Sequence, residues 1–301
     1  MREGAGLSDA AFDIWARAAL ATVEQALERW VPADAPGGLG GAMRYAVLEG
    51  GKRLRPMLVL AACGAVGGQP VAALRAAVAV ELIHAYSLVH DDMPCMDNDV
   101  LRRGKPTVHV QYGQALAMLA GDAMQALAFD VLTADGRVDP VIQARLCRLL
   151  ARAAGHAGMA GGQAIDLASV GRPLAEEMLR EMHRRKTGAL LKGSVLMGAA
   201  CGHPDPASLD ALEAYGDAVG LAFQVVDDIL DETQSSEILG KTAGKDREQN
   251  KPTYVSALGL RGARDYAQDL RARAHAALGA SGLAETSTLG ILADMVVQRD
   301  S

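Results

Sequence analysis

Segments with the periodicity of an α-helix fill almost the whole chain, and no stretch alternates apolar and polar residues as a half-buried strand does. Each segment runs for roughly 20 to 35 residues between glycine- and proline-containing turn signals. Half of the residues are apolar and only 4% are aromatic, and the many alanines and leucines favour helix. The chain is therefore predicted to be all-α, with residues 1–301 forming a single domain of about ten or more helices.

Charge and cysteine content exclude several classes of protein. The formal net charge is −6, from 30 basic and 36 acidic residues, and no basic tract or row of stacking aromatics is present. Binding of nucleic acid is therefore not expected. The four cysteines, Cys63, Cys95, Cys147 and Cys201, form no CxxC pair, so neither a zinc site nor a disulfide framework is predicted. They are expected to be small core residues in a reducing cytoplasm.

No segment has the pattern of a signal peptide or of a stable membrane span. The first helix is expected to begin near Ser8 or Asp9, without an apolar core before it. The longest uncharged stretch, residues 56–74, contains two prolines and three glycines. It therefore predicts a buried helix followed by a turn. The protein is expected to be cytoplasmic.

The first acidic cluster, HDDMPCMDND at residues 90–99, follows a strongly apolar segment at 78–89. Polar residues three or four positions apart form one stripe on this predicted helix: Glu81, His84, Ser87 and Asp91. Pro94 is expected to end or kink the helix, so that Asp97 turns back towards Asp91.

The second acidic cluster, FQVVDDILD at residues 223–231, lies among apolar residues. Asp227 and Asp231 share one helical face, and Gln224 lies one turn earlier. Carboxylates in such surroundings repel one another and lose hydration unless a cation neutralises them. Mg²⁺ takes one or two carboxylates together with substrate phosphates. The two clusters are therefore predicted to bracket one diphosphate through magnesium ions.

Basic segments accompany the acidic clusters. They are GGKRLRP (50–56), RRGKP (102–106), HRRKT (183–187) and the lysines of loop 240–252, Lys241, Lys245 and Lys251. Arginine suits bidentate contacts to phosphate and lysine acts as a point charge. A basic segment follows each acidic cluster within about twenty residues, which predicts a site with diphosphates on both sides of the metals.

These segments resemble those of the trans-prenyl diphosphate synthases, and more narrowly those of the bacterial farnesyl-forming members. The resemblance covers residues 42–299. The matching segments are GGKRLRP (50–56), HAYSLVHDDMPCMDNDVLRRGKPT (84–107), GGQAIDL (161–167), RRKTGAL (184–190), GLAFQVVDDILDET (220–233), LGKTAGKD (239–246) and NKPTY (250–254). Several of them in this order are far more specific than a single motif.

The resemblance implies an isoprenoid synthase-type bundle, usually a homodimer, with a deep central cavity between two aspartate-rich helices. It implies Mg²⁺ as cofactor, with three ions per site when substrate is bound. The implied metal ligands are Asp91, Asp92 and Asp97 on one wall and Asp227, Asp228 and Asp231 on the other. The implied contacts to the allylic diphosphate are Arg102, Lys186 and Lys241, and Lys251 is a further candidate. The implied contacts to isopentenyl diphosphate are Lys52, Arg55, His84 and Arg103.

The implied reaction is ionisation, condensation and elimination. Mg²⁺ and the cationic side chains stabilise the departing diphosphate, and the double bond of isopentenyl diphosphate attacks the allylic carbocation. Thr187 and Gln224 offer neutral oxygens near that cation, which they do not trap. Loop 240–252 is expected to close over the site and exclude water.

Two residues on the helix before the first cluster are candidates for the floor of the cavity. Ser87 and Tyr86 lie about 6 Å and about 7.5 Å along the axis from Asp91, and only Tyr86 is bulky. An aromatic at this place, with two extra residues between the aspartates, resembles the farnesyl-forming members. The expected product is therefore farnesyl diphosphate, with fifteen carbons.

Other hypotheses remain open from the residues alone. A class I terpene cyclase also uses aspartate clusters and magnesium, but it needs no second diphosphate site such as the cationic segment Lys52, Arg53 and Arg55 implies. A catalytically silent partner subunit is expected to lose aspartates from one cluster, and here both are complete. A synthase making a geranyl or geranylgeranyl product by the same chemistry is distinguished only by its product.

Overall fold

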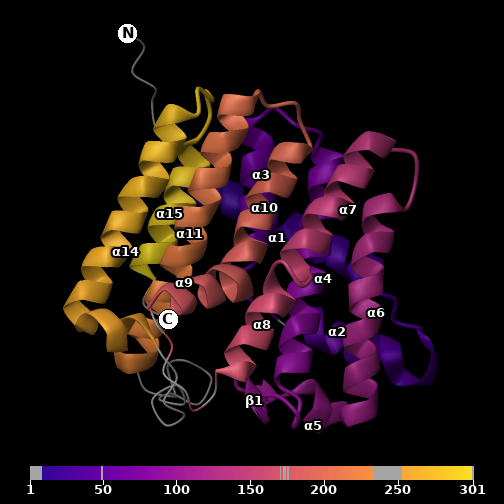
Figure 1. Ribbon diagram of the computed structural model, residues 1–301. Helices are drawn as coiled ribbons and strands as arrows, with labels where there is room; N and C mark the ends of the chain where they lie inside the picture. Colours follow the sequence, from indigo (N-terminus) through magenta and orange to yellow (C-terminus); the bar gives the residue numbers. More distant parts are fainter. Residues whose placement is uncertain are drawn as a thin grey trace.

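The computed structural model describes residues 9–48, 50–169, 171, 174, 176–233 and 253–299. These residues form a bundle of helices, and the β-structure among them is one short antiparallel hairpin (Figure 1). The predicted all-α class is confirmed.

The elements before the middle of the chain are α1 (Asp9–Trp30), η1 (Pro36–Gly38), α2 (Leu39–Leu48), α3 (Leu54–Ala65), α4 (Pro70–Asp91), β1 (Leu101–Arg102), β2 (Lys105–Pro106), α5 (Val108–Tyr112), α6 (Gln114–Thr133) and α7 (Pro140–Ala154). Those that follow are α8 (Met159–Ala168), α9 (Glu176–His183), η2 (Arg184–Gly188), α10 (Ala189–Ala200), α11 (Pro206–Thr233), α14 (Tyr254–Ala280) and α15 (Ser287–Gln298). The helix predicted within residues 56–74 and the turn after it are confirmed by α3 and the start of α4.

The hairpin was not predicted as β-structure, because its strands are only two residues long and carry no alternating pattern. Leu101 pairs with Pro106 and Arg102 with Lys105. The two turn residues, Arg103 and Gly104, have φ angles of 52° and 75°. Positive φ at both central positions is typical of the tight turn that matches the twist of a hairpin. The local fold thereby holds two consecutive arginines next to the first acidic cluster.

Two hydrophobic clusters form the core. Helices α3 and α10 lie between them, and each contributes one face to the first cluster and another face to the second. Leu190 and Met197 of α10 pack in the cluster that contains α4, α6 and α7. Leu191 and Val195, on the other face of α10, pack in the cluster that contains α11, α14 and α15. A helix that is apolar all round belongs in the interior. The pair α3 and α10 therefore separates the helices of the two acidic clusters, α4 and α11.

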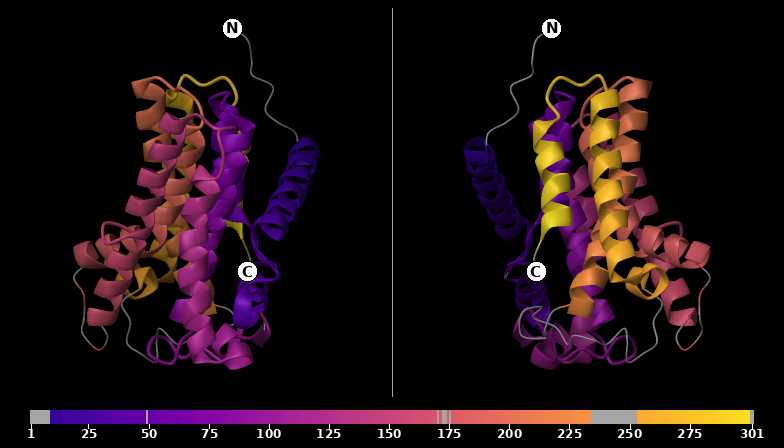
Figure 2. Two further views of the ribbon diagram at one scale, coloured as in Figure 1. Left: turned by 90° about the vertical axis from the view of Figure 1, so that its right-hand side faces the viewer. Right: turned by 90° about the vertical axis from the view of Figure 1, so that its left-hand side faces the viewer.

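The ends of α4 and α11 that carry the aspartates lie at the same end of the bundle, the lower end in Figure 1, where β1 and α5 also lie. Figure 2 shows α1 at one edge, and it packs there against α2, α3 and α4. This arrangement brings the first cluster at the end of α4, the second cluster near the end of α11, and the arginines of the hairpin to one end of the molecule.

Two described helices, α4 and α6, have the length and apolar composition of a membrane span. Length and composition alone do not distinguish such a span from a core helix. The apolar window of α4 is 67% buried inside the bundle, whereas that of α6 is only 39% buried. The apolar composition of α4 is explained by its burial in the core. Helix α6 has an apolar face that remains exposed.

The four cysteines do not share one environment. Cys63 and Cys201 are buried, as expected, and Cys147 is half-buried. The expectation is wrong for Cys95, which is exposed because it lies in the turn that follows α4.

Candidate active site

The first acidic cluster folds back on the end of α4. The helix ends at Asp91, three residues before Pro94, and the backbone N–H of Asp97 donates a 2.9 Å hydrogen bond to the carbonyl oxygen of Asp91. The predicted return of Asp97 towards Asp91 is confirmed. The proline therefore acts in the turn itself, after the helix has ended.

Asp91 lies in a site with too little positive charge. Burial raises the pKa of its carboxyl to about 6, and the neighbouring carboxylates of Asp97 and Asp92 act in the same direction. Lys186 and Arg102 oppose this rise without cancelling it. A divalent cation would supply the missing charge and favour the ionised carboxyl, so the environment of Asp91 fits a magnesium ligand.

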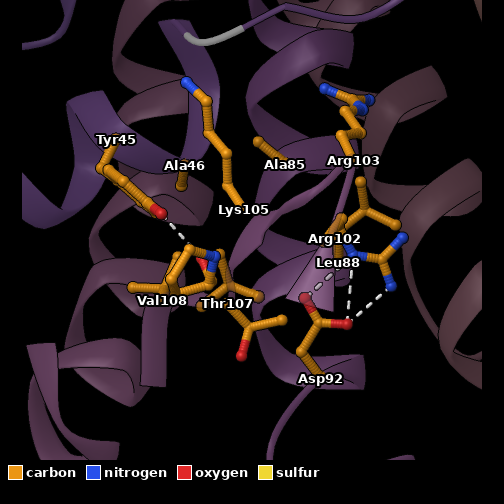
Figure 3. Close-up of a pocket in the computed structure, with 12 residues that line it drawn as sticks. Tyr45, Ala46, Ala85, Leu88, Asp92, Arg102, Arg103, Lys105, Thr107 and Val108 are labelled. Carbon is orange, nitrogen blue, oxygen red and sulfur yellow. Dashed lines mark hydrogen bonds and ion pairs between the residues drawn. The ribbon is translucent and has the colours of Figure 1, made fainter. Parts of the chain in front are cut away.

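Asp92 is bound by Arg102 through two parallel contacts. The Nε of Arg102 lies 2.9 Å from Oδ2 of Asp92 and its Nη2 lies 2.6 Å from Oδ1 (Figure 3). Asp92 is only 2% exposed. Such a bidentate pair is strong and geometrically specific. In this structure the two side chains neutralise each other, and the metal and diphosphate contacts implied for them stay predictions.

The cavity next to this pair is lined by residues of α2, the end of α4 and the hairpin (Figure 3). Its volume is about 60 Å³, which is room for water but not for an isoprenyl chain. The hydroxyl of Tyr45 donates to the carbonyl oxygen of Pro106 across 2.7 Å and so ties α2 to the hairpin. This cavity supports the arginines and is too small to hold the substrate.

The two adjacent aspartates of the second cluster face different surroundings. The side chain of Asp227 is 40% exposed, and its Oδ1 lies 3.6 Å from Nη2 of Arg299. Asp228 is only 4% exposed. Its Oδ1 accepts a 2.8 Å hydrogen bond from the amide of Gln224, and its Oδ2 accepts a 2.7 Å bond from the backbone N–H of Tyr254. Asp231, in the last turn of α11, is half-buried.

Arg299, near the end of the chain, reaches back into the second cluster. Its guanidinium carbon lies 3.9 Å from the ring centroid of Phe223, and its Nη2 donates to the carbonyl oxygen of Phe223 at 2.6 Å. Arg299 also lowers the pKa of Lys52, which burial lowers more strongly and Asp227 raises. Lys52 and Arg299 therefore both act on the Asp227 side of the site.

Lys186 and Thr187 lie in a turn of π-helix, η2. Such turns recur at functional sites, where they re-aim side chains out of the regular helical register. The Nζ of Lys186 is 2.5 Å from Oδ2 of Asp166 on α8, and this pairing raises its pKa against the opposing effect of burial. The hydroxyl of Thr187 donates a 2.9 Å hydrogen bond to Oε1 of Gln224. The predicted pair of neutral oxygens is thus brought together.

Two glycines on neighbouring helices make room for η2. A Cβ atom on Gly162 of α8 would lie 2.1 Å from the backbone nitrogen of Lys186. A Cβ on Gly220 of α11 would lie 2.9 Å from the Cα of Gly188. Any larger side chain at either position would displace the backbone that carries Lys186 and Thr187.

The segment GGKRLRP divides its three cations between two tasks. Arg53, with a φ of 47°, turns its guanidinium into the protein, where it lies 2.6 Å from Glu24 and 2.6 Å from Glu81. It is 3% exposed, so of the three cations in this segment Arg53 is the one held inside the protein by two carboxylates.

The ion pairs of Arg53 give a testable prediction for stability. Replacing Arg53 with methionine leaves the carboxylate of Glu81, which is 3% exposed, without its buried cation. Breaking a buried pair from one side costs about 3–5 kcal/mol, so a loss of that size in the free energy of unfolding is expected by urea titration. Arg273→Met, which removes an exposed pair with Asp269, is the control and should change little. Equal effects of the two substitutions would show that Glu81 is not held by Arg53.

The other cations predicted to bind isopentenyl diphosphate surround His84. Burial lowers the pKa of His84 well below its usual range, and Arg55, Arg103 and Arg102 add to the effect, so the ring is neutral at neutral pH. Burial also lowers the pKa of Arg55 to about 10. The Nη1 of Arg103 donates to the carbonyl oxygen of Gly50 at 2.5 Å, which places it beside the GGKRLRP segment. Arg55 and Arg103 therefore form a second cationic centre around the neutral ring of His84, next to the first acidic cluster.

Tyr86 and Ser87 lie on α4 before Asp91, as predicted. The ring of Tyr86 is half-buried and contacts the ring of His90 edge to face, with centroids 5.7 Å apart. Its hydroxyl bonds with Gln125 of α6. Ser87 donates from Oγ to the carbonyl oxygen of His84. Lys241 and Lys251, the remaining predicted contacts, lie outside the described residues, as does Lys245.

The two acidic clusters act on the same group of side chains. Asp91 and Asp97 raise the pKa of Lys186, and Lys186 and Asp227 both influence His183, whose pKa burial lowers to about 4. Lys186 therefore lies near the first cluster, and η2, the turn that carries it, packs against α11, the helix of the second cluster. Among the described residues no group of three or more aspartate, glutamate, histidine or cysteine side chains is arranged to hold a metal ion. The Mg²⁺ contacts implied for the two acidic clusters therefore stay predictions.

Several functional residues were not singled out by the sequence. Asp166 and Gly162 belong to the GGQAIDL segment, which was recognised as a motif but was given no role. Their spacing of four residues, which places both on one face of a helix, was the available signal. Nothing in the sequence pointed to Arg299, which reaches the site only because α15 packs beside α11.

A family model described as polyprenyl synthetase matches residues 38–280. The chain belongs to this family. It is a prenyl transferase of isoprenoid biosynthesis, and the trans-prenyl synthase resemblance of its motifs is confirmed.

Similar proteins extend over almost the whole chain. A chloroplastic geranylgeranyl pyrophosphate synthase of Capsicum annuum is 44% identical over 96% of this chain and 79% of its own length. The structure of an FPP/GFPP synthase from Zymomonas mobilis is 40% identical, with a TM-score of 0.84, covering 95% of this chain and 98% of that one. The structure of a geranyltransferase from Helicobacter pylori, complexed with magnesium and isoprenyl diphosphate, is 36% identical, with a TM-score of 0.82. The match covers 94% of this chain and 95% of that one.

Proposed function

We propose that this prenyl transferase condenses isopentenyl diphosphate with allylic diphosphates in a Mg²⁺-dependent reaction. The observation that carries the proposal is that η2 joins the two acidic helices: its Lys186 acts on Asp91 at the end of α4, and its Thr187 donates a 2.9 Å hydrogen bond to Gln224 of α11. A second cationic centre, formed by Arg55 and Arg103 around the neutral ring of His84, lies beside the first acidic cluster. Two such centres suit two diphosphates, whereas a terpene cyclase binds only one.

Each centre has a separate task in the proposed reaction. Asp91, Asp97 and Asp227 would hold Mg²⁺, and the ions would neutralise the departing diphosphate. Lys186 adds fixed positive charge at the same place. Lys52, Arg55 and Arg103 would hold isopentenyl diphosphate beside the allylic carbon. Thr187 and Gln224 present neutral oxygens to the carbocation.

Incubation with isopentenyl diphosphate and each allylic primer, with and without Mg²⁺, tests the proposal. Condensation that depends on Mg²⁺ is expected, and its absence with every primer would overturn the proposed activity. Chain-length analysis of the same reactions identifies the product.

Two products are proposed, each on a different observation. The curated relative from Capsicum annuum is named a geranylgeranyl pyrophosphate synthase, which favours twenty carbons as the end product. The aromatic ring of Tyr86, about 7.5 Å along α4 from Asp91, favours fifteen because it would block a longer chain. The relatives outweigh the single ring, so geranylgeranyl diphosphate is the first candidate and farnesyl diphosphate the second.

Replacing Tyr86 with alanine tests the floor of the cavity. If the growing chain reaches this ring, the variant should make a product at least one five-carbon unit longer than that of the unaltered enzyme, because the substitution removes the phenol. Liquid chromatography of the dephosphorylated products measures the change. Tyr266→Ala, which removes another half-buried tyrosine on α14, is the control. An unchanged product length in the Tyr86 variant would exclude this ring as the floor.

A homodimer in the cytoplasm completes the proposal. Met118 and Leu119 of α6 are 39% and 55% exposed, and Val110 of α5 is 50% exposed. Contiguous exposed apolar side chains mark interaction surfaces. A second copy of the chain on α6 would cover them, and analytical ultracentrifugation would measure the oligomeric state.

A further inference from the structure

A chain of hydrogen bonds links three elements that are distant in sequence. The hydroxyl of Thr187 in η2 donates to Oε1 of Gln224, and the amide nitrogen of Gln224 donates to Oδ1 of Asp228. The backbone N–H of Tyr254, the first residue of α14, donates to Oδ2 of the same carboxylate. Asp228 therefore accepts a bond from each side, one from the reaction centre and one from the framework.

We propose that Asp228 is a positioning residue, which orients the amide of Gln224 and, through it, the hydroxyl of Thr187 towards the reacting carbocation. The inference rests on the proposed prenyl-transfer function and deepens it. It assigns to Asp228 a role other than the metal contact that the resemblance implies for the three aspartates of the second acidic cluster.

The carboxylate gives the amide a single orientation. An ionised aspartate only accepts hydrogen bonds, so the nitrogen of Gln224 must face it. The amide oxygen must then face Thr187, whose hydroxyl uses its proton to reach it. The lone pairs of the Thr187 oxygen remain available for a cation. If the amide were reversed, its oxygen would lie 2.8 Å from the Asp228 carboxylate, where two negative ends repel.

The surroundings of Asp228 suit this role. It is 4% exposed, and one of its donors is the first N–H of α14, where the helix dipole favours an anion. Asp227, one residue earlier and about 100° around the helix, is 40% exposed at its side chain and lies by Arg299. The two neighbours thus face different sides: Asp227 the guanidinium of Arg299, and Asp228 the contact between α11 and α14.

The test separates orientation from metal binding. Asp228→Asn keeps the shape but replaces one acceptor oxygen with an NH₂ group, so the amide of Gln224 no longer faces a group that only accepts, and it loses its single orientation. A misplaced catalytic group costs about 10²-fold, and a fall of that order in kcat is expected, with little change in KM for either diphosphate. The affinity of the protein for inorganic pyrophosphate with Mg²⁺, measured by titration calorimetry, should remain that of the unaltered protein. Asp227→Asn should weaken that affinity.

A double-mutant cycle shows whether Asp228 acts through Gln224. In a Gln224→Ala background, Asp228→Asn should have no further effect on kcat, because the group it orients has been removed. The inference is overturned if the full loss persists in that background. It is also overturned if Asp228→Asn weakens the binding of Mg²⁺ and pyrophosphate as much as Asp227→Asn does.

A second variant covers the case in which Asp228→Asn does not fold, as circular dichroism would reveal. Gln224 is half-buried, so Gln224→Met should be tolerated. This substitution keeps the side-chain length and removes the amide, while Asp228 stays unaltered. It should reproduce the loss of kcat with unchanged pyrophosphate affinity, and an unaltered kcat would overturn the inference. If the unaltered protein condenses no pair of substrates, the proposed function fails, and calorimetry still decides whether Asp228 holds metal.

Discussion

Replacing Asp91 with asparagine is expected to lower kcat by about 10²–10³-fold, because a charge that holds Mg²⁺ against the leaving diphosphate is lost. Steady-state assays over a range of Mg²⁺ concentrations would measure the change, and higher Mg²⁺ should restore only part of the activity. Asp130→Asn, on the exposed end of α6, is the matched control and should behave as the unaltered enzyme. Full activity of the Asp91 variant at ordinary Mg²⁺ would exclude Asp91 as a metal ligand.

The same substitution is expected to stabilise the protein when Mg²⁺ is chelated. The pKa of Asp91 rises from 3.8 to about 6 on folding, so between these values the folded state binds more protons than the unfolded state. Its contribution to the free energy of unfolding therefore falls as pH rises through this window, and the penalty is complete above pH 6. Asparagine removes about 1–3 kcal/mol of this penalty. Urea unfolding in EDTA should show a gain that grows from pH 5 to pH 7.5.

A gain of equal size at both pH values would contradict this explanation, since the two proteins differ only in the ionisable group at position 91. The predicted combination, lower activity with higher stability, is typical of a site in which like charges are held together for function.

Lys186→Met is expected to be the second severe substitution. It removes a cation that acts on Asp91 and Asp97 of the first acidic cluster, and it leaves Asp166 without the 2.5 Å ion pair. A loss of about 10²–10³-fold in kcat/KM for the allylic substrate is expected, because the lost charge stabilises the leaving group. The KM for isopentenyl diphosphate should change much less. Single-turnover assays with each substrate varied in turn would separate the two effects.

Lys192→Met is the matched control, because Lys192 lies on the next helix, α10, and pairs with Glu213 and Asp217 of α11 away from the cavity. It should leave both kinetic constants unchanged. Equal losses in the two variants would mean that Lys186 acts through general stability. A rise in the KM for isopentenyl diphosphate with an unchanged allylic constant would assign Lys186 to the other diphosphate.

Residues whose role depends on local pattern were predictable from the sequence. The helical periodicity predicted the all-α class, since an apolar stripe every three or four residues has no use in a strand. The composition of HDDMPCMDND predicted that Asp97 returns towards Asp91. The reaction implied by the resemblance predicted Thr187 and Gln224 as two neutral oxygens near the carbocation, and the structure joins them at 2.9 Å.

Residues whose role depends on contacts between distant segments were not predictable from the sequence. In the sequence Arg53 is one of three cations that look equivalent. In the structure it is buried, because it forms ion pairs with Glu24 on α1 and Glu81 on α4. The π-helical turn of Lys186 has no local signature. Its register is accommodated by Gly162 of α8, whose missing Cβ leaves room for the backbone.

The sequence by itself determined the helical class, the order of the chemistry-bearing segments and the residue types that can hold magnesium and diphosphate. These follow from periodicity and from charge, which are properties of neighbouring residues. Only the tertiary structure decided that Asp227 lies exposed beside Arg299 while Asp228 is buried against Gln224 and the start of α14. Adjacent residues on a helix point in directions about 100° apart, and which direction meets the cavity depends on the helices packed around it.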